Sequence, residues 1–367
     1  MSDTDRANLT ARLNAWARGR FGPQVEVGKI HGIDGDVGDK GFGYANVLRV
    51  ELRNAEVSSV VLHVARRGGF GHDTLADRAH EAFLPWQTFG GFPHHVAALD
   101  VGYLDAEGAL VSAAPARDFY LVTAYAEGEP YFHDLQRIAE QGHATREDED
   151  RARRLAKLLA DAHHEKKDAP DLWQRRLRDL TGHHECIAGI VDSYDGKTGP
   201  ELPSPETLRR IEHRVLEHRH RLKSFAHRLS RVHGDFHPWN ILFHGESSQR
   251  EVMVLDRSRG AYGEPADDLT ALSINYLFFA LRHGPQAAAP LRALHRHFYD
   301  AWLSLTGDRE VLEVAQPYLV FRALVVASPV WYPDLPAGMR ARLFELIDAV
   351  LDMRRLDLDK VERYFTP

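Results

Sequence analysis

The chain has 367 residues, and its 46 lysines and arginines against 53 aspartates and glutamates give a formal net charge of −7. Its 44% hydrophobic and 27% charged residues exclude a wholly disordered chain, and the negative charge argues against a general nucleic-acid-binding protein. A single cysteine, Cys186, excludes an internal disulfide framework, and no apolar stretch approaches the ~20 residues of a membrane span. We therefore expect a cytoplasmic protein without a membrane partner.

The first third of the chain is rich in strand-forming residues. β-Branched and aromatic residues lie between Gly and Asp turns, which predicts several short strands. One helix interrupts them at 73–89, where Leu75, Ala79 and Phe83 recur at helical spacing. The predicted strands span 25–30, 44–52, 57–65, 95–103 and 118–124.

From residue 130 onward the pattern is helical, apart from a short β island at 232–243 and 251–256. Thr145 precedes a run of acidic residues at 147–150, and acids favour the positive end of a helix. The fold class predicted is α+β, with a small β-rich lobe at 1–124, a larger helical lobe at 125–367, and a ligand site where the lobes meet. The clearest predicted helices span 147–166, 205–225, 265–282, 290–305 and 339–353.

The most informative segment is the run HGDFHPWN, from His233 to Asn240. It places the carboxylate of Asp235 and the amide of Asn240 five positions apart, and Asp256 follows at the end of the next apolar run. Phosphoryl transfer needs such a set, because one carboxylate orients the attacking hydroxyl and two oxygen ligands hold Mg²⁺ on the ATP phosphates. The spacing from Asp235 to Asn240 equals that of the protein-kinase catalytic loop.

The same motif, followed by Leu-Asp at Asp256, resembles the aminoglycoside phosphotransferase family, which is related to the choline kinases. The resemblance implies a two-lobed protein-kinase-like fold and transfer of the γ-phosphoryl group of ATP to a hydroxyl of a small molecule. That acceptor would be an aminoglycoside, another antibiotic, an amino alcohol or a sugar. The resemblance assigns Asp235 as the catalytic base, Asn240 and Asp256 as Mg²⁺ ligands, and His233 and His237 as structural histidines of the loop.

Charged residues after Asp256 are candidates for supporting or acceptor-binding roles. Family members carry a further aspartate that opens a helix, and Asp268 is its closest counterpart, with Glu264 nearby. Arg257 and Arg259 follow Asp256 directly, and either they contact phosphate or substrate or they pair with local acids. The acids of the helical lobe either suit a cationic acceptor or form ordinary surface.

The nucleotide side rests on weaker signals. A glycine cluster between two strands lets backbone amides approach phosphates, and its position upstream of the motif favours a phosphate-covering loop. This loop comprises Gly38, Lys40, Gly41, Phe42 and Gly43.

Kinases hold the phosphates with a lysine on the third strand, but here His63 occupies the corresponding position, and no lysine occurs between Lys40 and Lys157. Lys40, Arg66 or Arg67 could substitute for that lysine, or His63 is simply a strand residue. The segment 120–128 resembles the hinge of the family, where main-chain groups of Ala124 and Ala126 would bind the adenine.

Two other functions stay open at this point. Because His63 replaces the expected lysine, the chain could be a nucleotide-binding pseudokinase or regulatory protein without turnover. His233 and His237 are four apart, as in some zinc sites, but Gly234 and Pro238 oppose the helix on which such a zinc pair lies.

Overall fold

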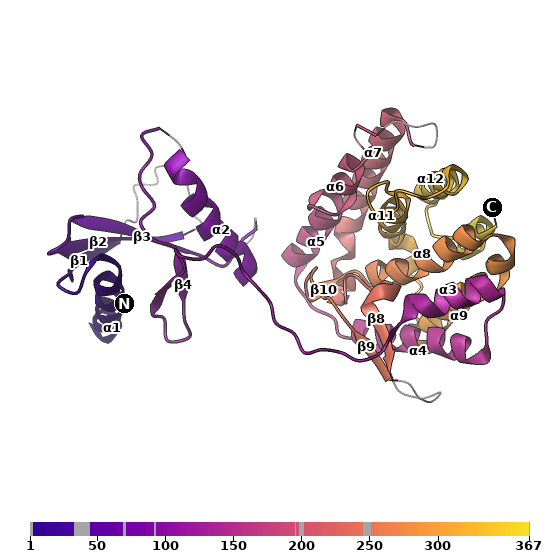
Figure 1. The fold of residues 1–367 in the computed structure, drawn as a ribbon, viewed down its shortest axis with the longest axis horizontal. Coiled ribbons are helices and arrows are strands. Elements are labelled where there is room, and N and C mark those ends of the chain that lie inside the picture. The colour runs from indigo at the N-terminus through magenta and orange to yellow at the C-terminus, as the bar shows by residue number, and fades with distance from the viewer. Residues whose placement is uncertain are drawn as a thin grey trace. The chain divides into compact units, whose positions relative to one another are not determined.

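The computed structural model describes residues 3–32, 45–68, 71–91, 93–194, 196–197, 202–244 and 251–366, and for 3–6 the backbone only. The chain separates into two compact units, Met1–Thr123 and Ala124–Pro367, which are coloured indigo to purple and magenta to yellow in Figure 1. The first unit contains most of the longer strands and the second is mainly helical, so the predicted α+β fold class is confirmed.

The first unit is built on a three-stranded antiparallel sheet of order β1-β2-β3. Helix α1 packs against β1, and Leu13 and Ala17 of the helix join Val50, Leu52 and Val60 of the sheet in a small core. The remaining elements are a second helix and a short antiparallel hairpin, β4 with β5. The bounds are α1 Asp3–Phe21, β1 Glu26–Gly32, β2 Ala45–Arg53, β3 Ser59–Ala65, α2 Leu75–Thr88, η1 Phe89–Gly91, β4 Gly102–Leu104 and β5 Leu110–Ser112.

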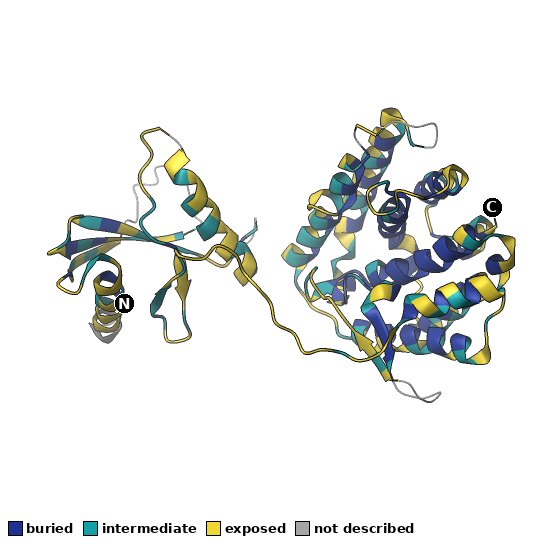
Figure 2. Cartoon of the chain, in the orientation of Figure 1, coloured by how far each residue is buried: buried dark blue, intermediate teal, exposed yellow. Residues whose placement is uncertain are grey.

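The second unit consists of helices packed around α8, together with two small sheets, β6-β8-β9 and β10-β7. Figure 2 shows α8 as an almost continuously buried helix, and every residue from Pro265 to Leu281 except Asp267 is buried. Its elements are β6 Glu129–Pro130, α3 Tyr131–Gln141, α4 Arg146–His163, α5 Pro170–Gly182, α6 Ile187–Asp192, α7 Pro205–Leu222, η2 Lys223–Arg228, β7 Ser230–Arg231, η3 Pro238–Asn240, β8 Ile241–His244, β9 Glu251–Val254, β10 Tyr262–Gly263, α8 Pro265–His283, α9 Pro285–Thr306, α10 Val311–Val314, α11 Gln316–Ala327, α12 Ala337–Asp352, α13 Leu358–Glu362 and η4 Arg363–Phe365.

Local sequence signals set several helix boundaries. The hydroxyl of Thr145 accepts a hydrogen bond from the backbone N–H of Asp148, whose carboxylate accepts from the N–H of Thr145, so this capping box starts α4 as predicted. Helix α8 ends at Gly284, whose φ of 88° is costly for other residues, and α9 begins at once with Pro285. The predicted start of α9 at Pro290 was therefore wrong by five residues.

The strand predictions failed where an apolar run has no partner. The segment 118–124 has no strand, and Phe119, Tyr120, Leu121 and Val122 are exposed. Composition favoured a strand there, but a strand forms only when a neighbour takes up its backbone hydrogen bonds. The prediction for 95–103 was wrong for the same reason over most of its length, since pairing begins only at Gly102. Among the described residues, no helix combines the length and the apolar character needed to cross a bilayer.

Candidate active site

The motif from His233 to Asn240 lies between two strand pairs of the second unit. On one side β7 pairs with β10, and on the other β8 and β9 form an antiparallel hairpin in which Ile241 lies opposite Val254. This register places Asn240 beside Leu255, whose N–H donates to the carbonyl of Asn240 over 2.9 Å. Asp256 is the next residue, so the hairpin brings its backbone near that of Asn240.

The side-chain oxygen atoms of these two residues have no hydrogen-bond partner among the described residues. The Nδ2 group of Asn240 donates to the carbonyl of Asp235 over 3.1 Å, and its Oδ1 accepts no hydrogen bond from the described part of the chain. Asp256 is exposed, has a φ of 52°, and within the described part of the chain its carboxylate has no hydrogen bond or ion pair. Carboxylate and amide oxygens are ligands that Mg²⁺ prefers, so this pair fits the ion. In the ranges the structure describes, no three His, Cys, Asp or Glu side chains could together hold a metal.

Three cationic or basic groups surround the carboxylate of Asp235. Its Oδ1 accepts from Nη1 of Arg322 over 2.6 Å and lies 4.0 Å from Nε of Arg259, while its Oδ2 lies 3.6 Å from Nε2 of His237. Burial raises the pKa of Asp235, but the positive charges of Arg322 and then Arg259 outweigh it, so the pKa lies below its usual value. Asp235 is therefore ionised at neutral pH.

Arg322 holds this carboxylate in place from α11. Its Nη2 donates to the carbonyl of Gly234 over 2.9 Å and to Oδ1 of Asp267 over 2.7 Å, and the side chain is only 6% exposed. Sequence reasoning missed Arg322, although an arginine in the middle of the apolar run 317–327 is a detectable signal, because a buried charge needs a partner. The ion pairs of Arg322 with the carboxylates of Asp267 and Asp235 keep the guanidinium charged despite its burial, and its pKa is raised accordingly.

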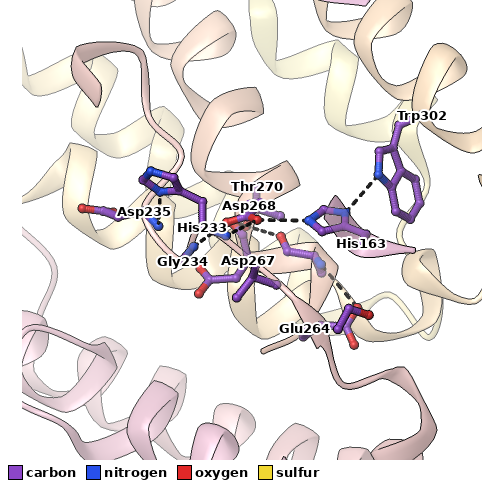
Figure 3. Close-up of polar contacts among 12 residues, drawn as sticks. His163, His233, Gly234, Asp235, Glu264, Asp267, Asp268, Thr270 and Trp302 are labelled. Carbon is purple, nitrogen blue, oxygen red and sulfur yellow. Dashed lines mark hydrogen bonds and ion pairs between the residues drawn. The ribbon is translucent and has the colours of Figure 1, made fainter. Parts of the chain in front are cut away.

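Asp268 fixes the backbone of the loop and lies between the loop and His163 (Figure 3). Its fully buried carboxylate accepts from the backbone N–H of His233 over 2.8 Å and of Gly234 over 2.7 Å. Nε2 of His163 lies 3.0 Å from Oδ2 of Asp268. Nδ1 of the same ring accepts a hydrogen bond from the indole N–H of Trp302 over 3.1 Å. Since an indole only donates, Nε2 of His163 carries the proton and donates to Asp268.

These contacts also determine the charge of Asp268. Burial raises the pKa of Asp268. The hydrogen bonds from His163 and from the two loop amides lower this pKa by more than burial raises it, so the net shift is downward. His163 and Trp302 were not predicted, because nothing in the sequence separates them from the other histidines and tryptophans.

The remaining candidates from the motif region have partners inside the protein. Glu264 is buried against Arg228, at 2.9 and 2.6 Å, which leaves its carboxylate unavailable to an acceptor. Arg257 donates to the carbonyls of Val232 and Ala261, both over 2.8 Å, and thereby supports the strand before the loop. His233 accepts from the N–H of Asp235 over 3.3 Å through Nδ1.

The candidate nucleotide-binding residues have fewer described contacts than the residues of the motif. The loop residues Gly38, Lys40, Gly41, Phe42 and Gly43 lie outside the described residues. His63 is exposed on β3 and pairs with Val47 of β2. Arg66, considered as a substitute for the missing lysine, donates from Nε to Oδ1 of Asn46 over 2.6 Å. Ala124 and Ala126 lie in a segment without helix or strand.

Comparison with known proteins gives one family match. The model of the phosphotransferase enzyme family matches residues 43–307. Among proteins with curated descriptions, none matches the sequence of this chain.

Solved structures with some likeness include three small-molecule kinases. A glucosamine kinase in complex with glucosamine, ADP and inorganic phosphate is 18% identical over 60% of this chain and 56% of its own, with a TM-score of 0.38. A choline kinase from Cryptosporidium parvum is 12% identical over 99% and 93%, with a TM-score of 0.30. A spectinomycin phosphotransferase in complex with ADP and spectinomycin is 11% identical over 97% and 98%, with a TM-score of 0.29. These scores are too low to support an inference about the chain.

Proposed function

Because the chain belongs to the phosphotransferase enzyme family, the prediction of a small-molecule kinase is confirmed, and we propose that it transfers the γ-phosphoryl group of ATP to a hydroxyl. The acceptor oxygen forms a new bond to the γ-phosphorus, and the bond from that phosphorus to the bridging oxygen breaks. ADP leaves with the electron pair of that bond, and the hydroxyl proton passes to Asp235.

The observation that carries this proposal is the setting of Asp235. Arg322 holds its Oδ1 over 2.6 Å, which fixes the carboxylate and leaves Oδ2 to orient the acceptor hydroxyl. The lowered pKa keeps Asp235 unprotonated and ready to accept a hydrogen bond from the hydroxyl. Since the reaction needs no covalent intermediate on the protein, positioning and charge neutralisation supply most of the rate.

Asn240 and Asp256 would hold Mg²⁺ through Oδ1 and a carboxylate oxygen. Support comes from the β8–β9 register, which pairs Asn240 with Leu255, the residue before Asp256, and from the lack of described protein partners for these oxygens. When bound, the ion would neutralise charge on the triphosphate. The protein supplies only two ligands, so phosphate oxygens and water would complete the octahedral shell that Mg²⁺ requires.

We assign the nucleotide-binding role to residues of the first unit and of the segment after it. His63 would approach the phosphates in place of the usual lysine, and main-chain groups of Ala124 and Ala126 would bind the base. The phosphate-covering loop would comprise Gly38, Lys40, Gly41, Phe42 and Gly43. These assignments rest on the family pattern.

The experiment is to compare the wild-type chain with the Asp235→Asn variant. ADP release is measured with Mg·ATP and a panel of alcohols, and ATP binding is measured by calorimetry. We expect turnover to fall by about 10²- to 10⁴-fold with ATP affinity within a few-fold of wild type, because a general base contributes about that factor. Asp352→Asn, at an exposed ion pair on α12, is the matched control.

The outcomes separate the candidate functions. Equal turnover in Asp235→Asn and wild type would refute the role of Asp235. ATP binding without turnover of any alcohol would instead favour a nucleotide-binding regulator, the alternative raised by His63.

A further inference from the structure

Two arginines approach the same oxygen of Asp235 and differ in what else they contact. Arg322 is 6% exposed, and its terminal nitrogens reach two carboxylates and a carbonyl within 2.9 Å. Arg259 is 25% exposed, and its Nε lies 4.0 Å from Oδ1 of Asp235. The terminal nitrogens of Arg322 are thus occupied by protein acceptors, whereas the side chain of Arg259 is partly exposed to solvent.

Arg259 is held in place by contacts that use none of its charged donors. Its guanidinium lies over the ring of Phe321, 5.1 Å from the centroid, and its carbonyl accepts from Nη1 of Arg176 over 2.8 Å. A Cβ atom added to Gly234 would come within 3.1 Å of the Cβ of Arg259, so the loop packs directly on this side chain. Its position is built into the site beside the candidate base.

The guanidinium has donors to spare. It carries five N–H groups, and its one hydrogen bond among the described residues is a 3.6 Å contact to Sγ of Cys186. The nearest carboxylate apart from Asp235 is that of Glu185, at 3.8 Å, on a side chain that is 70% exposed. A carboxylate or phosphate group on a ligand could therefore bind in the bidentate manner that arginine favours.

Three acids near the loop are not free to attract a cationic acceptor. Asp267 is bonded to Arg322, Asp268 to the loop amides, and Glu264 to Arg228. Among the described residues around Asp235, Arg259 is a positive charge whose N–H donors are largely unused.

Arg259 also lies beside the base. Its Nε lies 4.0 Å from Oδ1 of Asp235, whereas Nε2 of His237 lies 3.6 Å from Oδ2. Building on the proposed function, we propose that the acceptor carries an acid group, a carboxylate or a phosphate, beside the hydroxyl, and that Arg259 binds it. Arg259 would thus determine specificity.

The test uses matched acceptors that differ in the acid: glycerate or glycerol phosphate against glycerol, and gluconate against glucitol, with choline and kanamycin as cations. ADP release is measured with Mg·ATP, and binding by calorimetry with Mg²⁺ and a non-hydrolysable ATP analogue. We expect the acid-bearing members to exceed their neutral partners in kcat/KM and in affinity by about tenfold to a hundredfold, the worth of hydrogen bonds between charged groups. Carboxylate and phosphate members are compared to identify the acid.

Variants then assign the preference to Arg259. Arg259→Gln should reduce the acid-to-neutral ratio to near one, Arg259→Lys should restore part of it, and Glu185→Gln, which removes a competing acid, should raise it. Arg342→Gln is the matched control, because Arg342 is 29% exposed, lies 4.5 Å from the centroid of the Tyr364 ring and pairs with Glu345, away from the site. It should leave the ratio as in wild type.

Two results would overturn the inference. The first is acid-bearing members that neither bind nor react better than their neutral partners. The second is an Arg259→Gln variant that slows acid and neutral acceptors equally, which would mean that the guanidinium acts on the transferred phosphoryl group. Asp235-dependent turnover of neutral alcohols in either case would leave the proposed function standing.

Discussion

The two ends of the loop from His233 to Asn240 are built in opposite ways. At the buried end, the amides of His233 and Gly234 are bonded to Asp268, which His163 contacts in turn. At the open end, the side-chain oxygen atoms of Asn240 and Asp256 have no hydrogen-bond partner among the described residues.

The difference separates the structural function of the loop from its chemical function. Buried polar groups are stable only when they are paired, so the buried end is as fully bonded as the core around it. Oxygen atoms left unpaired near the surface are available to a ligand. Changes at the buried end should therefore reduce stability and activity together, and changes at the open end should reduce activity alone.

Among changes at the two ends of the loop, the largest loss of turnover is expected from Asp256→Asn. The variant keeps the shape of the residue and removes one negative charge from the proposed Mg²⁺ site, so kcat/KM should fall by about 10²- to 10³-fold. The melting temperature should stay within about 1 °C of wild type, since a surface substitution without partners costs little. Titration of activity with Mg²⁺ should show a weaker apparent affinity. A large loss of stability would contradict the separation of the two ends.

Asp268→Asn should come next and affect both properties. Its NH2 group would replace one of the two accepting oxygens and face either the Gly234 amide or the His233 amide and His163, and the buried negative charge would be lost, so we expect a loss of about 3–5 kcal/mol in the free energy of unfolding. Turnover should fall by about tenfold or more as the loop loosens. Because the pKa of Asp268 is lowered by folding, its stabilisation is present above the usual aspartate pKa and is lost as the pH falls below it. Urea unfolding at pH 7 and pH 3 measures this, and an equal difference at both values would contradict the assigned charge.

Arg322→Gln should shift the pH dependence more than the rate. Without the guanidinium, the lowering of the Asp235 pKa by Arg322 is lost and that pKa rises, so the acid limb of the kcat/KM profile moves to higher pH. At neutral pH we expect a loss of about tenfold, and Arg322→Lys should return the limb toward its original position.

Arg228→Gln is the control for Arg322→Gln. Arg228 is equally buried, with Glu264 as its partner, so stability should fall similarly, but the acid limb should stay in place. A limb that moves in both variants would point to general loosening of the fold.

The smallest effect is expected from Trp302→Phe. The change leaves Nδ1 of His163 without its donor and should cost about 1 kcal/mol of stability. Turnover should change by about twofold or less, because Asp268 keeps both loop amides. Thermal melts alongside steady-state kinetics would detect the difference, and a tenfold loss of turnover would show that the outer contact positions the loop more tightly than we infer.

Some of this site can be read from the sequence because its parts are local. The hairpin that brings Asn240 to Asp256 consists of two adjacent apolar runs, and the capping box at Thr145 spans four residues. Spacing along the chain determines geometry over such short distances. The predicted α+β class follows from the same local patterns.

The rest depends on contacts between distant segments. Arg322 lies 87 positions from Asp235 and His163 lies 105 from Asp268, so no pattern of neighbours could pair them. The run from Phe119 to Val122 failed for the converse reason, since its composition favours a strand but no described strand pairs with it. Side-chain partners and strand pairing are tertiary properties.

The backbone of Asp256 restricts which residue can serve at this position. A left-handed residue other than glycine is tolerated best when it is aspartate or asparagine, whose short side chains bond locally. Glutamate would keep the charge and lengthen the reach, yet it would meet a steric penalty that aspartate largely avoids. Both the negative charge and the left-handed backbone therefore favour aspartate at position 256. Replacing this aspartate by glutamate is not a conservative change.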